Sequence, residues 1–334
     1  MNRDARRLHY FMPALVLVVL LPIAFILLKT RPTNSVVLYC SQDEDYALEL
    51  LREIERDGRL SIRTKFDTEA NKSVGLVAEL IAEAQHPRAD LHWNNEPLGS
   101  LRLERRGVYE AGSLVQFAER ARVLIVNTTL VPEAEWPTSI FDMTRPRWKG
   151  RTAIAKPIFG TTASHAACLF EVLGDSAAQQ FFRDLVGNGV TVVAGNKQVA
   201  RGVAGGDFAF GLTDSDDAAL EVLAGKPVAI VFPDDASNAA FPRLGCLFLP
   251  NTIAVVKDGP NAGRAASVKA AIVAMEAELA RGGGYQFPRT AGVAGPTLPC
   301  LQPYRTVRRM QPDFDRAVDH WEAVFAFLRE LLTR

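Results

Sequence analysis

The stretch Gly211-Leu212-Thr213-Asp214-Ser215-Asp216-Asp217 joins an apolar run to a helical pattern through a turn crowded with carboxylates and hydroxyls. The apolar run, 208–212, is typical of a buried strand. After the turn, 218–223 repeats apolar residues at helical spacing, and Gly225 is a suitable stop for a helix. The sequence therefore predicts a strand, an acidic turn and a helix at this point.

Two interpretations of the acidic turn remain open. Helix capping explains part of it, with Thr213 or Ser215 as the N-cap and two carboxylates facing the positive end of the helix. Capping does not require five polar groups together at the carboxyl end of a strand, which is where open α/β sheets bind their ligands. A cation-facing or polar-ligand site is the alternative.

The same pattern of strand, polar loop and helix occurs on both sides of this stretch, which indicates an α/β fold with largely parallel strands. Apolar strands are expected at 36–40, 60–66, 89–93, 121–127, 152–155, 190–193, 208–212, 228–232, 246–249 and 252–256. Helices are expected after the first two strands and at 98–107, 161–173, 177–186, 198–204, 261–281 and 314–332.

Composition limits the classes of function. The 334 residues carry 38 basic and 38 acidic side chains, so the net charge is zero and no basic excess indicates a nucleic-acid partner. A chain of this length predicts two domains. The four cysteines allow three pairings that the sequence does not distinguish, and no disulfide is predicted. Cys168, within an apolar helical run, is expected to be a buried free thiol.

The amino terminus has the pattern of a membrane anchor. Every residue in 11–28 is apolar, with arginines before this run and Lys29 and Arg31 after it. Eighteen residues rise about 27 Å as a helix, just enough to span a membrane. A cleaved signal peptide is the competing interpretation, but no small-residue cleavage site follows. We expect an uncleaved transmembrane helix within 1–35, with the remainder of the chain on the extracytoplasmic face.

Several stretches together resemble periplasmic-type solute-binding proteins, in the branch of ferric-ion-binding proteins that serve ABC importers. They are Val36-Val37-Leu38-Tyr39-Cys40-Ser41, the run 67–77, Ala89-Asp90-Leu91-His92-Trp93-Asn94-Asn95-Glu96-Pro97, the run 120–128 and Lys156-Pro157-Ile158-Phe159-Gly160-Thr161-Thr162. The resemblance spans the folded part from Val36 to about Lys257.

The resemblance implies a two-lobed periplasmic-binding-protein fold that closes around a ligand by hinge motion. Lobe one would comprise 36–126 plus 253–334, and lobe two 127–252. Hinge strands would lie near 123–127 and 251–255. The protein is expected to be a monomer.

The resemblance also implies metal ligands. In the iron-binding relatives two adjacent tyrosines hold the metal, often with a histidine and a glutamate. Here Glu96 matches the glutamate, Asp43 stands in place of the histidine, and Asp214-Ser215-Asp216 replaces the tyrosine pair. We predict Asp43, Glu96, Asp214 and Asp216 as metal ligands, with Asp217 as a further candidate. Such a cluster of carboxylates requires a hard metal ion or an organic ammonium group between them.

Other residues complete the predicted ligand site. Trp93, with Tyr39 nearby, could present an aromatic face to an ammonium group. Gly160, Thr161 and Thr162 open a helix whose free amides suit the bound anion of the family, although a simple N-cap explains them equally well. Asn95, Thr213 and Ser215 are the remaining predicted ligand-binding residues. As exposed loop carboxylates, Glu96 and Asp214 should be replaceable by alanine with loss of binding and little loss of stability.

The predicted function is an ABC-transporter substrate-binding protein. It captures a cationic solute, iron(III) or another metal ion with a synergistic anion, in an acidic interdomain cleft and delivers it to a membrane permease. The missing tyrosines leave the ligand open, and a receptor for a polyamine or an aminoalkyl phosphonate is the alternative. An anchored enzyme or sensor is the third reading. Ser164 and His165 do not form a nucleophile and base, because adjacent side chains on a helix do not face each other.

Overall fold

The computed structural model describes residues 35–58, 60–67, 74–281 and 284–333. The predicted transmembrane anchor falls on residues outside these ranges. Within the described ranges, no helix has both the length and the apolar character needed to cross a membrane. Residues 36–334 form one compact unit.

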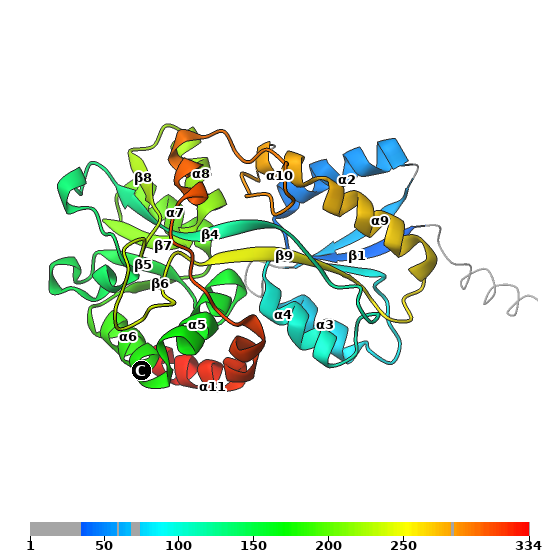
Figure 1. The fold of residues 1–334 in the computed structure, drawn as a ribbon, viewed down its shortest axis with the longest axis horizontal. Coiled ribbons are helices and arrows are strands. Elements are labelled where there is room, and N and C mark those ends of the chain that lie inside the picture. The colour runs from blue at the N-terminus through cyan, green and yellow to red at the C-terminus, as the bar shows by residue number, and fades with distance from the viewer. Residues whose placement is uncertain (1–34, 59, 68–73, 282–283, 334) are drawn as a thin grey trace, which may run out of the picture. The chain divides into compact units, whose positions relative to one another are not determined.

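The described strands form one mixed sheet in the order β2-β1-β3-β9-β4-β7-β5-β6, with β8 paired to β4 (Figure 1). The strands are β1 Val36–Cys40, β2 Ile62–Phe66, β3 Leu91–Asn94, β4 Val115–Asn127, β5 Thr152–Ala155, β6 Thr191–Val193, β7 Phe210–Asp214, β8 Val228–Val231 and β9 Phe248–Val255. Strands β1, β2 and β3 pair in parallel, as do β5, β6 and β7, while β4 and β9 are antiparallel to their neighbours. The sheet thus consists of two parallel halves, which we call the first and second half-sheets, joined by β4 and β9.

Helices cover both faces of each half-sheet (Figure 1). The first carries α2 Glu44–Gly58, α9 Ala262–Ala274 and α10 Glu276–Arg281 on one face and α3 Val74–Ala82 and α4 Pro97–Arg105 on the other. The second carries α7 Asn196–Gly205 and α8 Ser215–Leu223 on one face and α5 Gly160–Leu173, α6 Asp175–Gly187 and α11 Phe314–Thr333 on the other. Short 3-10 helices lie at η2 Glu133–Glu135, η3 Ile140–Thr144, η4 Pro146–Trp148 and η5 Pro299–Arg305.

Burial on both faces explains the continuous apolar strands. Val36, Leu38 and Cys40 of β1 pack in the core beneath α2 and α9, whereas Val37 and Tyr39 pack in the core beneath α3. Strand β4 divides its side chains between two cores in the same alternating way. Apolar side chains on both faces suit these positions, since neither face meets water.

The joining strands differ from their prediction. The sequence predicts two short strands at 246–249 and 252–256, on either side of Pro250, but β9 is continuous. Opposite Pro250, β4 carries a bulge at Ala118, whose φ is 34°, and the backbone of Glu119 exchanges both hydrogen bonds with Phe287. Strand β4 therefore does not require the N–H that proline lacks.

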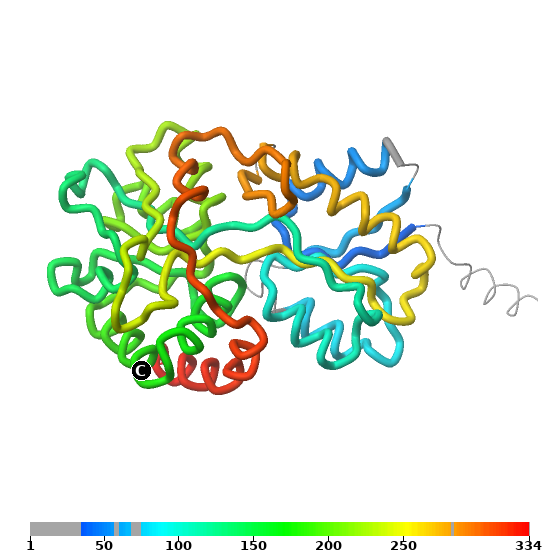
Figure 2. The backbone as a smooth tube through the Cα atoms, viewed as in Figure 1, coloured from blue at the N-terminus to red at the C-terminus, as the bar shows by residue number. Residues whose placement is uncertain are grey.

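A third segment also passes between the two half-sheets. Figure 2 shows the chain after α10 running across β4 toward the second half-sheet and ending in α11. The apolar face of α11 packs with α5 and α6, while Arg105 of α4 pairs with Asp315 and Asp319 of α11. The predicted assignment of 253–334 to lobe one remains a prediction, and α11 contacts elements of both predicted lobes.

Candidate functional site

A pocket lies where loops from both half-sheets meet. Asp43 after β1 and Asn95 after β3 line it from the first half-sheet, and the loop after β5, the start of α7 and the acidic turn line it from the second. These are carboxyl ends of strands, the location where α/β sheets bind ligands. Seven of the eleven predicted ligand-binding residues line this pocket: Asp43, Asn95, Gly160, Thr161, Thr162, Asp214 and Asp216.

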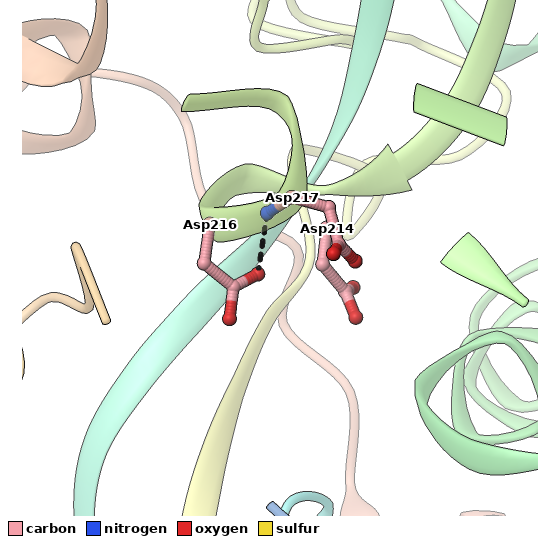
Figure 3. A group of neighbouring side chains, drawn as sticks. All are labelled: Asp214, Asp216 and Asp217. Atoms are coloured by element: carbon pink, nitrogen blue, oxygen red, sulfur yellow. Dashed lines mark hydrogen bonds between the residues drawn. The ribbon is translucent and has the colours of Figure 1, made fainter. Parts of the chain in front are cut away.

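The acidic turn supplies a cluster of oxygen atoms. One carboxylate oxygen from each of Asp214, Asp216 and Asp217 lies within 4.8 Å of the others, where β7 gives way to α8 (Figure 3). Asp214 occupies the N-cap position of α8 but makes no side-chain capping bond. Neither hydroxyl of the turn caps the helix: Thr213 Oγ1 donates to the carbonyl of Asn196 at 2.9 Å, and Ser215 Oγ accepts from the backbone of Ala121 at 3.1 Å. Neither hydroxyl is therefore the predicted N-cap, although Asp216 and Asp217 do lie in the first turn of α8, as the capping interpretation expected.

Asp214 is paired with a buried arginine. Arg122 of β4 is fully buried and places Nη1 2.6 Å from Asp214 Oδ1. The second oxygen of Asp214 accepts from Thr161 Oγ1 at 2.7 Å and Asn196 Nδ2 at 3.0 Å. Every one of these partners is itself held in the strand or at a helix start, so this ion pair is part of the rigid wall of the pocket.

Asp216 is paired with the other arginine of β4. Arg120 Nε lies 3.2 Å from Asp216 Oδ2, and both residues line the pocket. The pKa of Asp216 is raised to about 6, chiefly by burial and also by Asp214 and Asp43, while Arg120 opposes the increase. Burial alone would lower the pKa of Arg120, but the neighbouring carboxylates Asp216 and Asp214 outweigh it, and the net pKa is raised. Both groups are therefore charged at neutral pH.

Groups that attract anions share the same pocket. Helices α5, α7 and α8 begin at its edge, and none of the three has a side-chain cap. Helix starts without a side-chain cap present N–H groups and partial positive charge, although in α8 the backbone of Asp217 already donates to Asp216 Oδ1 at 3.1 Å. Lys156 and Lys197 add two ammonium groups to the lining. The structure thus sets three basic lining residues and Arg122 beside four aspartates, so the charges in and behind the pocket are nearly balanced.

Glu96, a predicted metal ligand, lies outside the pocket lining, and its carboxylate is bonded elsewhere. Its carboxylate caps α4 by accepting from Leu98 N at 2.7 Å and Gly99 N at 2.9 Å. Asn94 Nδ2 at 3.0 Å and Ser164 Oγ at 2.5 Å occupy its remaining lone pairs. Burial raises its pKa, against the effect of these hydrogen bonds. Glu96 is 1% exposed and Asp214 is 4% exposed, so the expectation that both are exposed loop carboxylates is wrong.

Trp93 also lies outside the pocket lining. Its side chain is fully buried, with its ring 5.8 Å from that of Phe117. Tyr39 points toward α3, where its hydroxyl donates to Glu83 at 3.0 Å. Neither ring can serve as the predicted aromatic face in this arrangement. Thr213 and Ser215 hold the acidic turn in place through their hydrogen bonds to the backbone of Asn196 and Ala121.

The sequence analysis missed the basic half of the site. Arg120 and Arg122 stand two apart in an apolar strand, and an arginine inside such a run must find a buried partner. That pattern could have indicated an ion pair with the acidic turn. Lys156, Asn196 and Lys197 had no comparable signal, since polar residues beside a helix start are common.

Comparisons with known proteins agree with this geometry. Residues 103–246 match the family model of bacterial extracellular solute-binding proteins. Over 101 residues the chain is 29% identical to the Fe(3+)-binding periplasmic protein of Serratia marcescens, an alignment that covers 30% of this chain and 29% of that protein.

Two solved structures share the fold over almost their whole length. The apo ferric ion-binding protein A of Pasteurella haemolytica has a TM-score of 0.77 at 15% identity, covering 90% of this chain and 98% of the other. The periplasmic binding protein AfuA of Actinobacillus pleuropneumoniae, solved with exogenous fructose-6-phosphate bound, has a TM-score of 0.75 at 19% identity, with the same coverage.

The fold is that of the two-lobed periplasmic binding proteins, as predicted. In sequence, the chain is similar to extracytoplasmic solute-binding proteins and resembles their ferric-ion-binding branch. Both the matched family model and the Serratia protein are described as binding proteins, one for solutes and the other for Fe(3+). All four cysteines are free in the structure, and Cys168 is buried, as predicted.

Proposed function

We propose that this protein is the extracytoplasmic substrate-binding component of an ABC importer, which captures iron(III) together with an anion and delivers it to a membrane permease. The observation that carries the proposal is the placement of three carboxylates opposite uncapped helix starts in one pocket. Oxygen ligands suit a hard cation, and free helix N–H groups suit an anion. The sequence relative from Serratia supports iron as the metal.

The proposed coordination differs from that implied for the tyrosine-containing relatives. Among the described residues that line the pocket, none is a tyrosine. The oxygen ligands would come from Asp216, Asp217 and Asp43, with Asp214 held by Arg122 at the edge of the cluster. A metal ion bound to Asp216 would replace Arg120 as the positive partner of that carboxylate. The anion would complete the coordination from the side of Gly160 and Lys197.

We also propose where the protein acts and in what oligomeric state. The amino-terminal anchor of the sequence analysis would hold the protein at the outer face of the cytoplasmic membrane, next to its permease. The protein would act as a monomer, because each chain contains both walls of its own pocket.

The test is ligand-induced stabilisation of the purified full-length chain. Thermal unfolding is followed with ferric citrate, ferric nitrilotriacetate, citrate alone, and manganese, calcium and zinc salts. A ligand that binds only the folded state at a hundredfold over its Kd stabilises it by about 2.7 kcal/mol. We expect a shift with a ferric complex that exceeds the shift with the anion alone.

Variants identify the pocket as the binding site. Asp216→Asn and Asp217→Asn should each weaken ferric binding, while Asp184→Asn, on the exposed surface of α6, should leave it unchanged. Ferric binding that survives in both pocket variants would place the site elsewhere. A chain that no ferric complex stabilises would remove iron from the proposal.

A second candidate function has its own supporting observation. Lys156, Lys197 and Arg120 line the pocket with the starts of α5, α7 and α8, an arrangement that suits a phosphate or phosphonate group. The remaining aspartates would then hold an ammonium group, as in an aminoalkyl phosphonate. The likeness of fold to AfuA is consistent with this alternative. Stabilisation by 2-aminoethylphosphonate or fructose-6-phosphate, with none by ferric complexes or spermidine, would favour it.

A further inference from the structure

Arg120 is the centre of a buried polar network beside the pocket. Its side chain is almost fully buried, two residues after the bulge at Ala118 in β4. Nη2 donates to Gln42 Oε1 at 2.8 Å and to Asn251 Oδ1 at 3.3 Å, while Nε faces Asp216 Oδ2 at 3.2 Å. One guanidinium therefore joins the loop after β1, strand β9 and the acidic turn.

The network continues away from the pocket. Gln42 Nε2 donates to Asn251 Oδ1 at 2.8 Å, and Asn251 Nδ2 donates to Gln286 Oε1 at 2.6 Å. Gln286 Nε2 then donates to the hydroxyl of Tyr46 in α2 at 3.2 Å. Asn251 and Gln286 are both fully buried. Contacts thus run without a gap from Asp216 to all three segments that pass between the half-sheets and on to α2.

The backbone next to Arg120 is held in a strained shape. Ala118 has a positive φ of 34°, which a residue with a side chain rarely adopts. Glu276 of α10 fixes this bulge by accepting from Ala118 N at 2.6 Å, and it also accepts from the backbone of Arg289 and Thr290. A bulge in a joining strand is a natural point of bending. Arg120 extends from this point directly to the ligand pocket.

We propose that Arg120 is a positioning residue that couples the charge on Asp216 to the three segments joining the half-sheets, so that occupancy of the pocket changes their hydrogen bonding. This inference rests on the proposed function, in which a ligand neutralises Asp216. When Asp216 is neutralised, Arg120 loses this ionic partner, and its hydrogen bonds to Gln42 and Asn251 strengthen. The guanidinium reaches the three groups in fixed directions, with Nη2 on Gln42 and Asn251 and Nε beside Asp216.

A double-mutant cycle tests the coupling without any ligand. Asp216→Asn mimics the neutralised carboxylate, and hydrogen–deuterium exchange of the full-length chain is measured for peptides containing Gln42, Asn251 and Gln286. Asp216→Asn should change exchange in all three peptides by about tenfold. In the Arg120→Gln background, the same substitution should produce no further change. Additive effects of the two substitutions would overturn the proposal.

A second measurement, made with ligand, distinguishes this inference from the proposed function. Small-angle scattering gives the radius of gyration with and without ferric citrate. The wild-type chain should contract and the Arg120→Gln variant should not, with affinity reduced about tenfold. Arg120→Lys should restore the affinity in part, through charge, but not the coupled exchange. Arg243→Gln, which breaks an ion pair with Glu171 remote from the pocket, should contract like the wild type.

Failure of the proposed function and failure of the proposed role of Arg120 give different results. A wild-type chain that binds no ferric complex refutes the proposed function, while the ligand-free cycle still decides the role of Arg120. Contraction of the Arg120→Gln variant to the wild-type extent refutes the inference and leaves the function intact.

Discussion

Two arginines, two residues apart on β4, each pair with an aspartate of the same acidic turn, yet the two pairs differ in almost every other respect. Arg122 and Asp214 are enclosed, and partners in α5 and α7 surround their ion pair. Arg120 and Asp216 face the pocket and connect to residues of β9 and the loop after β1. A charge pair closed by its neighbours supports the fold, whereas a pair open to a pocket can respond to what enters it. The following predictions test this contrast, beginning with the largest effect.

Breaking the enclosed pair should cost the most stability. Arg122→Met leaves Asp214 buried without its counter-charge, and the free energy of unfolding should fall by about 3–5 kcal/mol. Urea denaturation of the full-length chain measures it. The double variant Arg122→Met with Asp214→Leu should recover part of the loss, because no buried charge then remains. A single variant as stable as the wild type would show that the pair is not structural.

Glu96 offers an intermediate case. Glu96→Ala removes the cap of α4 and the acceptor for Ser164, so the free energy of unfolding should fall by about 1–3 kcal/mol. Ferric binding should persist, since Glu96 does not line the pocket. Calorimetric titration at a temperature well below the unfolding midpoint checks this. Loss of binding in a stable, folded variant would restore Glu96 as a metal ligand.

The open pair should respond to pH instead. The pKa of Asp216 is raised to about 6 from 3.8, so its ionised form is disfavoured in the free folded protein. The protonated carboxyl of Asp216 therefore stabilises the folded state. This contribution is fully present below the pKa of the unfolded chain, 3.8, and is lost as the pH rises through about 6. Metal binding requires the ionised form, so ferric affinity should fall up to about tenfold per pH unit below 6. Titrations with a ferric chelate from pH 5 to 7.5 test this, and Asp216→Asn should flatten the profile.

Exposed ion pairs give the smallest effect. Arg105 of α4 is 38% exposed and pairs with Asp319 at 2.6 Å. Arg105→Ala should lower the free energy of unfolding by no more than about 1 kcal/mol, and added salt should reduce the difference. Denaturation at low and high ionic strength measures it. A loss as large as that from Arg122→Met would mean that exposure is not what separates these pairs.

The sequence was sufficient for the fold because burial on both faces produces unmistakable strands. The apolar runs at β1, β5 and β7 and the helix starts after them were predicted within a few residues. The joining strands were harder: Pro250 reads as a break, and only the bulge opposite it in β4 shows why it is tolerated. The first half of β4, Val115–Arg120, was missed because charged residues interrupt its apolar pattern.

The site was predicted less completely than the fold. Position after a strand correctly indicated which loops meet, so Asp43, Asn95 and Asp216 line one pocket. Position did not indicate which way a side chain turns, and Glu96 turned back to cap its own helix. Nor did the acidic turn reveal its counter-charges, because the two arginines that balance it lie some 90 residues earlier in the chain. A cluster of carboxylates in a sequence therefore does not by itself establish an acidic site.

The position of β9 in the sheet has a consequence for synthesis of the chain. This strand, Phe248–Val255, lies between β3 and β4, so the first half-sheet cannot be joined to β4 until about three quarters of the protein has been made. Pairings between residues so far apart in sequence form slowly. The nascent chain should therefore stay open for longer before it folds, which would favour export to the extracytoplasmic location that we propose.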